Sequence, residues 1–289
     1  ARTTQAGGTT RPKERTAMSA PHRPLTSADL LSQGPLRRLG RRVFLHDTLD
    51  STNRFLLDHA ADAGDGAVAC AESQSAGRGR LGRRWEAPRG SSVLLSVLLH
   101  EPADTPLLSQ GALLASVAAC EAVAAATDCS PVVRWPNDVV LNGRKLGGVL
   151  AESCALRTAE GAARRAVVIG IGLNCLQQRG HFAGEFADRA TSLECESRHA
   201  VDRALVAGHL LARLDTWLAM CNVVEGGWQR MRTTWRKHCE DIGTRVTLEH
   251  DGRTFAGTAL DLDDQGDLIV QLDHGGRRHF AATTTTRAG

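Results

Sequence analysis

Residues 72–85, ESQSAGRGRLGRRW, concentrate glycine and arginine: three glycines and four arginines fall within residues 77–84. Glycine allows a backbone to adopt left-handed dihedral angles and to approach a ligand closely. Arginine presents a rigid fork of donors that matches phosphate and carboxylate groups. The stretch therefore predicts a loop that wraps a small anion. A solvated basic loop is the simpler alternative at this point.

Gly77, Gly79 and Gly82 also match the Gly-x-Gly-x-x-Gly spacing of dinucleotide-binding loops. That motif requires a helix that begins at the loop and points its N-terminus at the pyrophosphate. Residues 85–90, WEAPRG, are typical of a turn, so the dinucleotide-binding interpretation is disfavoured. A P-loop is excluded because no Gly-Lys-Ser or Gly-Lys-Thr follows the glycines.

Lys145 is the second candidate for chemistry on an anion. The chain has 35 basic residues of the lysine and arginine types, and only Lys13, Lys145 and Lys237 are lysines. A compact ammonium contacts a carboxylate and a phosphate together as a point charge, where a planar guanidinium does not fit. Gly147 and Gly148 follow in the same predicted strand, where glycine permits close approach of a ligand. The alternative is a surface lysine without a role.

The other polar candidates lie where predicted strands and helices end, which is where functional residues concentrate. They are Ser51, Thr52, Asn53, Gln74, Asn137, Asp138 and Asn174. Asn53 alone is equally consistent with a helix start, and Asn137 and Asp138 with a plain turn. No metal site is predicted: there is no His-Glu-x-x-His pattern, and the calcium-like run from Asp261 has Leu272 at its final ligand position.

The apolar pattern predicts the elements that must position these candidates. Ser51 or Thr52 can cap a helix, and Asn142-Gly143 is a favoured hairpin turn. We expect helices over residues 51–60, 107–127, 202–220 and 225–238. We expect strands over residues 42–46, 67–72, 92–99, 132–135, 139–141, 144–152 and 166–175.

The pattern divides the chain into three regions. Residues 1–40 are rich in Thr, Arg, Pro and Ser and are expected to be a flexible extension. Residues 41–240 form the main domain. From residue 241 the pattern changes to short alternating strands with Asp-Gly and Gln-Gly turns, so residues 241–289 are expected to be a small all-β module.

Composition narrows the class of protein. The hydrophobic content of 42% and charged content of 23% are ordinary for a soluble globular protein, and a net charge of +3 is too small for a general nucleic-acid binder. The eight cysteines form no Cys-x-x-Cys pair, which favours reduced thiols in a cytoplasmic protein over a disulfide framework. No uninterrupted apolar run of about 18 residues occurs, so no membrane span is expected. The oligomeric state is not determined.

Taken together, these residues resemble the biotin–protein ligases over residues 42–285. The family's motifs occur in order and at family spacing. They are Ser-Thr-Asn at 51–53, Gln-x-x-Gly-Arg-Gly-Arg-x-Gly-Arg-x-Trp at 74–85, Arg-Trp-Pro-Asn-Asp at 134–138, Lys-Leu-x-Gly-Val-Leu-x-Glu at 145–152 and Gly-x-Gly-x-Asn at 170–174.

The resemblance implies an α+β fold: a mixed β-sheet with flanking helices, related to class II aminoacyl-tRNA synthetases, followed by a small C-terminal SH3-like β-barrel. Residues 41–240 would then be the catalytic domain. The implied reaction has two steps. Biotin and Mg-ATP give biotinyl-5′-adenylate and pyrophosphate, and the adenylate then transfers biotin to one lysine of a biotin carboxyl carrier protein. The implied cofactors are biotin, ATP and Mg²⁺.

The same resemblance assigns roles to residues. Catalysis is expected from Lys145 and Arg80. Biotin contacts are expected from Ser51, Thr52, Asn53, Gln74, Arg78, Gly79, Arg80, Lys145 and Gly148. Adenylate contacts are expected from Gly77, Arg78, Arg80, Arg83, Trp85, Asn137, Asp138, Lys145 and Asn174, with Asp138 near the metal or the incoming lysine. No protein metal site is expected.

Two other functions remain as alternatives. A lipoate–protein ligase shares the fold and the two-step logic, but its Arg-Arg-x-Ser-Gly-Gly-Gly segment is absent here. A nucleic-acid-binding module could grip phosphates with the arginine loop, but the low net charge and the 4% aromatic content disfavour it. No groove-reading helix pair is predicted, so we expect no DNA binding. Residues 281–287 lack an apolar final strand, which leaves closure of the barrel open.

Overall fold

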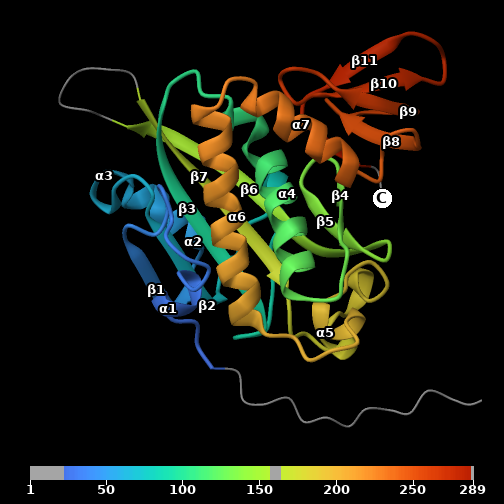
Figure 1. The fold of residues 1–289 in the computed structure, drawn as a ribbon. Coiled ribbons are helices and arrows are strands. Elements are labelled where there is room, and N and C mark those ends of the chain that lie inside the picture. The colour runs from blue at the N-terminus through green and yellow to red at the C-terminus, as the bar shows by residue number, and fades with distance from the viewer. Residues whose placement is uncertain (1–22, 157–163, 288–289) are drawn as a thin grey trace, which may run out of the picture.

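The computed structural model describes residues 23–156 and 164–287, and the remaining residues lie outside the description. The described chain forms a seven-stranded mixed sheet flanked by helices and a separate five-stranded antiparallel sheet (Figure 1). The fold class expected from the sequence is therefore confirmed.

The seven-stranded sheet contains every strand expected before residue 241. In order across the sheet, its strands are β1 (Val43–Leu49), β2 (Val68–Gln74), β3 (Ser92–Pro102), β7 (Arg164–Asn174), β6 (Arg144–Leu156), β5 (Asp138–Leu141) and β4 (Val132–Arg134). Strands β1 and β2 are parallel, and the other neighbours are antiparallel. The hairpin between β5 and β6 turns at Asn142 and Gly143, whose φ angles of 50° and 76° are those of the favoured two-residue turn.

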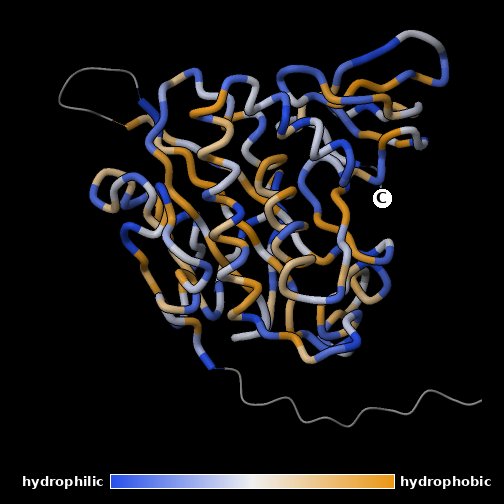
Figure 2. The backbone as a smooth tube through the Cα atoms, viewed as in Figure 1, coloured by the Kyte–Doolittle hydropathy of each residue, from blue (hydrophilic) through white to orange (hydrophobic). Residues whose placement is uncertain are grey.

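One face of this sheet is covered by two long helices, α4 (Leu107–Ala126) and α6 (Arg203–Val223), which lie in front of it in Figure 1. A third helix, α7 (Gly227–His238), packs against both of them. Hydrophobic residues follow the central strands and α4, and hydrophilic residues occupy many of the peripheral turns (Figure 2). The main core therefore lies between this face and α4 and α6.

The opposite face carries the shorter helices α2 (Thr52–Asp58) and α3 (Ala60–Ala63). Their apolar residues form a second, smaller core cluster with β2, β3 and β7, which includes Leu56, Leu98 and Val168. Ser51 is the N-cap of α2, as expected from the sequence, and Gly64 follows the end of α3. This smaller cluster leaves part of the face free for polar residues.

Helices α4 and α6 are long and apolar enough to cross a membrane by length and composition alone. However, 72% of the most hydropathic window of α4 and 56% of that of α6 are buried inside the molecule. Core helices of folded proteins satisfy the same criterion, because an apolar helix can be covered by protein as well as by lipid. The core that α4 and α6 form here accounts for their length and apolar composition.

Residues 23–40 correct one expectation. They were expected to belong to a flexible extension, but Leu25, Leu30 and Leu39 are buried in the main core cluster. A short helix, α1 (Ser27–Leu30), is capped by Thr26 and contacts α6. The Asp215 carboxylate accepts the N–H groups of residues 37–39. Hydrophobic burial thus fastens this segment, and residues 1–22 lie outside the described part.

The second sheet contains the strands that follow residue 241. In order, they are β11 (Arg277–Phe280), β10 (Leu268–Leu272), β9 (Arg253–Leu262), β8 (Arg245–His250) and β12 (Thr285–Arg287). Strand β12 forms although its sequence is not apolar, because it pairs with β8 and buries the Thr285 side chain. We call these five strands the C-terminal sheet. The short elements between β7 and α6 are η2 (Arg179–His181), η3 (Gly184–Phe186) and α5 (Leu193–Glu196).

Candidate functional site

The start of α2 brings Ser51, Thr52 and Asn53 against the sheet, and all three are buried. The Ser51 hydroxyl accepts the Arg54 N–H at 3.4 Å and so caps the helix. The backbone N–H and the hydroxyl of Thr52 both donate to Oε1 of Gln74, at 2.8 and 3.2 Å. Gln74 ends β2, so these contacts fix the helix start beside the end of that strand.

Asn53 occupies a space that a glycine provides. Its amide group donates to the Leu150 carbonyl at 3.1 Å and to the Glu152 carboxylate at 2.9 Å, and the Ser96 hydroxyl donates to its Oδ1 at 2.7 Å. A Cβ atom on Gly170 would lie only 2.0 Å from Oδ1. Position 170 of β7 must therefore lack a side chain for Asn53 to occupy this space.

The glycine–arginine loop, residues 77–84, folds back on itself and does not begin a long helix. The Gly79 N–H donates to the Arg83 carbonyl at 2.7 Å, and the Trp85 N–H donates to the Gly77 carbonyl at 3.0 Å. Its single short turn, η1 (Arg80–Gly82), contains Leu81 at a φ of 53°. The loop lacks the helix N-terminus that dinucleotide binding requires, as the sequence indicated.

Lys145, Asp138 and Trp85 lie together at the other end of the site. The Lys145 ammonium is 2.6 Å from Oδ1 of Asp138 and 6.0 Å from the centroid of the Trp85 ring. Trp85 lies over Gly172, where a Cβ atom would be 2.6 Å from the ring, and a Cβ atom on Gly148 would be 3.4 Å from Cε of Lys145. Two facing glycines, paired in register between β6 and β7, thus provide room beside the only lysine of the sheet's described residues.

The side chains of Arg78 and Arg80 have different partners, although the two residues are only two positions apart in one loop. The Arg78 guanidinium is 2.6 Å from the Glu152 carboxylate on β6. The Arg80 guanidinium donates to Oδ1 of Asn137 at 3.1 Å, to the Thr285 carbonyl at 2.7 Å and to the Ala282 carbonyl. Burial lowers the pKa of Arg80 from its usual value. In this structure Arg80 therefore links the loop to the C-terminal sheet.

Asn174 and Arg83 are not brought into this group by side-chain contacts. Asn174 is buried, donates to the Thr191 carbonyl at 3.0 Å and accepts from Gln177 at 2.8 Å, so it fastens the segment that follows β7. Arg83 is exposed and contributes its carbonyl to the loop. Their expected adenylate contacts remain predictions.

Sequence reasoning assigned no role to two neighbours of the site. Glu152 lay inside a recognised motif but was given no role, although positions 148, 150 and 152 share one face of β6. The second neighbour is the segment around Ala190, which forms a parallel bridge with Lys145. The Lys145 N–H donates to the Arg189 carbonyl at 2.7 Å and its carbonyl accepts the Thr191 N–H at 2.9 Å. Residues 190–193, Ala-Thr-Ser-Leu, resemble a further segment of the family, but this resemblance does not indicate which strand the segment pairs with.

The buried cysteines near the sheet do not supply a nucleophile, and the described residues contain no cluster of metal ligands. Burial raises the pKa of the Cys70 and Cys175 thiols to about 12, so neither provides a thiolate nucleophile at neutral pH. Within residues 23–156 and 164–287, no group of three or more His, Cys, Asp or Glu side chains could hold a metal ion. The site offers cations, amides and hydroxyls, together with the carboxylates of Asp138 and Glu152. Its cations and amides suit an anionic or amide-containing ligand.

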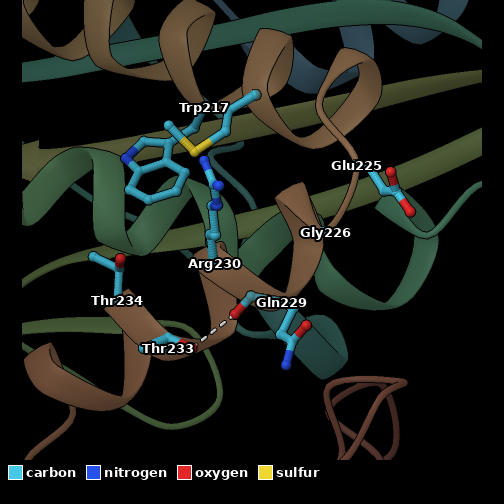
Figure 3. Close-up of a pocket in the computed structure, with 8 residues that line it drawn as sticks. Trp217, Glu225, Gly226, Gln229, Arg230, Thr233 and Thr234 are labelled. Carbon is cyan, nitrogen blue, oxygen red and sulfur yellow. Dashed lines mark hydrogen bonds between the residues drawn. The ribbon is translucent and has the colours of Figure 1, made fainter.

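A pocket of about 600 Å³ lies elsewhere, between α6 and α7 (Figure 3). Trp217 and Arg230 line it from the two helices, and no residue predicted for function does so. Its lining residues are Trp217, Met220, Glu225, Gly226, Gln229, Arg230, Thr233 and Thr234. Because α6 covers the face opposite α2, this pocket is separate from the polar site.

Comparison with known proteins gives two family matches. Residues 45–174 match the biotin/lipoate A/B protein ligase family, and residues 241–282 match the biotin protein ligase C terminal domain. The chain is 32% identical over 245 residues to the bifunctional ligase/repressor BirA of Bacillus subtilis, covering 84% of this chain and 74% of that protein. It is 37% identical over 236 residues to the biotin–[acetyl-CoA-carboxylase] ligase of Mycobacterium tuberculosis, covering 78% and 81%.

A solved structure has the same fold. The biotin protein ligase from Aquifex aeolicus, in complex with biotin and ATP, superposes with a TM-score of 0.72 at 24% identity. The match covers 86% of this chain and 99% of that one.

Proposed function

The chain belongs to the biotin protein ligase family, and from this premise we propose how its residues bind and activate biotin. It is an enzyme that uses ATP to attach biotin to a protein through a biotinyl-5′-adenylate intermediate. The observation that carries the residue assignment is the convergence of three family motifs, around Asn53, Arg78 and Lys145, on the glycine-lined face of one sheet.

The proposed acceptor is one lysine of a biotin carboxyl carrier protein that serves acetyl-CoA carboxylase. Support comes from the names of relatives, which are called biotin–[acetyl-CoA-carboxylase] ligases in Mycobacterium tuberculosis and Paracoccus denitrificans. We further propose a cytoplasmic location and no binding partner among DNA or membranes. A modest net charge of +3 supports this part of the proposal.

The polar cluster at the start of α2 is proposed to bind the ring end of biotin. The ureido group of biotin presents two N–H donors and one carbonyl acceptor. Hydrogen-bond donors and acceptors for this group are supplied by the hydroxyls of Ser51 and Thr52 and by the amide of Gln74. Gly79 and Gly148 allow the backbone to approach the ligand closely. A buried polar ligand needs such partners, because an unpaired polar group costs about 1–3 kcal/mol.

Lys145 is proposed to serve the carboxylate end and the α-phosphate of ATP. The attacking carboxylate and the phosphate are both anionic, so a cation between them lowers the barrier to their contact. A carboxylate oxygen of biotin forms a bond to the α-phosphorus, and the bond to pyrophosphate breaks, with its electron pair leaving on that group. The ammonium, now paired with Asp138 at 2.6 Å, would exchange this partner for the substrates.

The second step consumes the mixed anhydride. The acceptor lysine amine attacks the biotinyl carbonyl, AMP leaves with the bonding electrons, and the amine loses one proton as the amide forms. We propose that Arg80, Asn137 and Trp85 hold the adenylate during this step, with Gly77, Arg83 and Asn174 nearby. The Trp85 ring supplies a flat apolar surface for a base, and its buried Nε1 has no protein partner.

Mg²⁺ is proposed to accompany ATP. The residues fit this ion, because Mg²⁺ is commonly bound by one or two carboxylates together with substrate phosphates and water. Asp138 is the carboxylate of the described site that stands beside the proposed phosphate position. When bound, the ion would neutralise phosphate charge.

The test is transfer to a purified biotin carboxyl carrier domain. Protein, ATP, Mg²⁺ and labelled biotin are incubated with that domain, and mass spectrometry locates the modification. We expect one biotinyl group on a single lysine, dependent on ATP. Lipoate in place of biotin tests the sister activity of the family, and a filter assay with DNA tests the nucleic-acid alternative.

Three outcomes would contradict the proposal. Transfer of lipoate in preference to biotin would assign the chain to the other branch of the family. Modification of carrier lysines without ATP would exclude the adenylate route. Absence of transfer, with an acceptor that a known ligase modifies in parallel, would exclude this acceptor.

A further inference from the structure

Glu152 joins two parts of the site that are far apart in the sequence. One carboxylate oxygen lies 2.6 Å from the Arg78 guanidinium, and the other accepts the Asn53 amide at 2.9 Å. Its side chain is 19% exposed, whereas that of Arg78 is 42% exposed. The carboxylate thus connects β6 with both α2 and the glycine–arginine loop.

The orientation of the Asn53 side chain depends on this carboxylate. An ionised carboxylate accepts hydrogen bonds and cannot donate them, so the NH₂ group of Asn53 must face Glu152. The second amide hydrogen goes to the Leu150 carbonyl at 3.1 Å, and Oδ1 receives the Ser96 hydroxyl at 2.7 Å. Both amide hydrogens of Asn53 are therefore donated to acceptors of the protein itself.

Arg78 is fastened in a loop that is otherwise costly to order. Gly77, Gly79 and Gly82 increase the conformational entropy lost on ordering, and the neighbouring guanidinium groups repel one another. The ion pair between Arg78 and Glu152 offsets part of this entropy loss and part of this repulsion. Because the pair is partly exposed, screening by water and salt limits its strength.

We propose that Glu152 is a positioning residue that holds the loop through Arg78 and orients Asn53, so that the loop backbone is already placed when the ligand arrives. On this view Arg78 acts chiefly as a tether and not as a free anion-binding side chain. The proposal deepens the proposed function, because its catalytic consequences rest on adenylate formation at this site. Its structural consequence, order in the ligand-free loop, does not rest on that function.

The first measurement is hydrogen exchange of the ligand-free protein. Glu152→Gln keeps an acceptor for Asn53 but removes the charge that pairs with Arg78. We expect amide exchange in residues 77–85 to accelerate about two- to fivefold, in line with the loss of a partly exposed ion pair. Wild-type exchange in this segment would overturn the proposal, whatever reaction the protein catalyses.

The second measurement is a double-mutant cycle on adenylate retention. Glu152→Gln and Arg78→Gln should each accelerate release of bound biotinyl adenylate about two- to fivefold, and the double variant should release it no faster than the single variants. The Michaelis constant for biotin should rise while kcat for pyrophosphate release changes less, because positioning precedes chemistry. Additive effects would overturn the tether, since independent residues give additive free energies.

Glu101→Gln is the matched control. Glu101 is also a shielded carboxylate in the same domain, 2.6 Å from an arginine, Arg38, but it contacts no residue of the site. We expect it to lower thermal stability and to leave loop exchange and adenylate retention unchanged. Equal effects of both variants on the loop would reduce Glu152 to a general stabilising role. A wild-type protein that forms no adenylate would instead contradict the proposed function, and the exchange experiment would still decide on Glu152.

Discussion

The two faces of the seven-stranded sheet are built from the same strands but differ in their packing: one is filled by apolar side chains and the other is lined by glycines and polar residues. On β7, Ile169, Ile171 and Leu173 point into the main core under α4 and α6. The alternate residues Gly170 and Gly172 face the polar site, where Asn53 and Trp85 occupy the space that their missing side chains leave. A strand alternates its side chains between faces, so one sequence can build a filled face and a hollow one together.

The difference shows what each face requires. The filled face needs volume, because a close-packed core loses free energy for every cavity. The hollow face needs glycine for space and polar partners for every buried donor and acceptor. Ser96 illustrates the second requirement, since its hydroxyl on β3 contacts both Thr52 and Asn53 at 2.7 Å. Substitutions on the two faces should therefore separate stability from activity.

The largest expected effect is on the filled face. Ile171→Ala should lower the free energy of unfolding by about 2–5 kcal/mol, because it leaves a cavity in the core. Ile171→Val should lower it by about 0.5–1.5 kcal/mol. Denaturant unfolding measures both values. The Michaelis constant for biotin should stay near wild type in the folded variant, and a large rise would show that the two faces are not separable.

The hollow face should respond in the opposite way at Lys145. Lys145→Gln and Lys145→Arg should fold normally and lose adenylation by about a hundredfold or more, equivalent to roughly 3 kcal/mol of transition-state stabilisation. Transfer from synthetic biotinyl adenylate should suffer less, because the phosphate is then a leaving group. Pyrophosphate release measures the first step. Lys237→Gln, on the exposed part of α7, is the control, and wild-type release by Lys145→Gln would remove Lys145 from the mechanism.

Arg80 tests whether the hollow face depends on the C-terminal sheet. Arg80→Gly removes the contacts to Asn137 and to the Thr285 carbonyl. Charge-assisted hydrogen bonds contribute about 1.5–3 kcal/mol, so release of the mixed anhydride should accelerate roughly ten- to a hundredfold. Non-selective acylation of lysines on a bystander protein reports that release. Retention equal to wild type would exclude Arg80 as a residue that holds the adenylate.

The smallest expected effect comes from filling the hollow face by one methyl group. Gly170→Ala would place Cβ 2.0 Å from Oδ1 of Asn53, so Asn53 must shift away from Glu152. We expect the Michaelis constant for biotin to rise about tenfold, equivalent to about 1.4 kcal/mol. Gly180→Ala is the control, because nothing lies within 4 Å of its added Cβ. Equal Michaelis constants for the two variants would show that the space beside Gly170 is not needed.

Much of the local structure follows from the sequence. Ser51 caps α2, and Asn142-Gly143 turns the β5–β6 hairpin, because caps and tight turns depend on a few neighbouring residues. The apolar runs predict the strands and the long helices for the same reason. The motifs also predict which residues share a site, although their individual roles stay predictions. Local chemistry and spacing are sufficient for each of these inferences.

Other features depend on contacts between distant segments. The composition of residues 23–40 indicates flexibility, yet Leu25, Leu30 and Leu39 are buried in the core. Strand β12 has no apolar pattern, and it forms because β8 offers an edge to pair with. Neither outcome has a local signal, since burial and pairing depend on what the rest of the chain places nearby.

The two arginines of the loop separate the two kinds of information most clearly. The sequence by itself determined that Arg78 and Arg80 lie in one glycine-rich loop suited to an anion. Only the tertiary structure decided that Arg78 pairs with Glu152 on β6, while Arg80 reaches the Thr285 carbonyl, 205 positions along the chain. Partner choice depends on which acceptors surround each guanidinium after folding, and that arrangement arises from long-range packing, which no local pattern encodes.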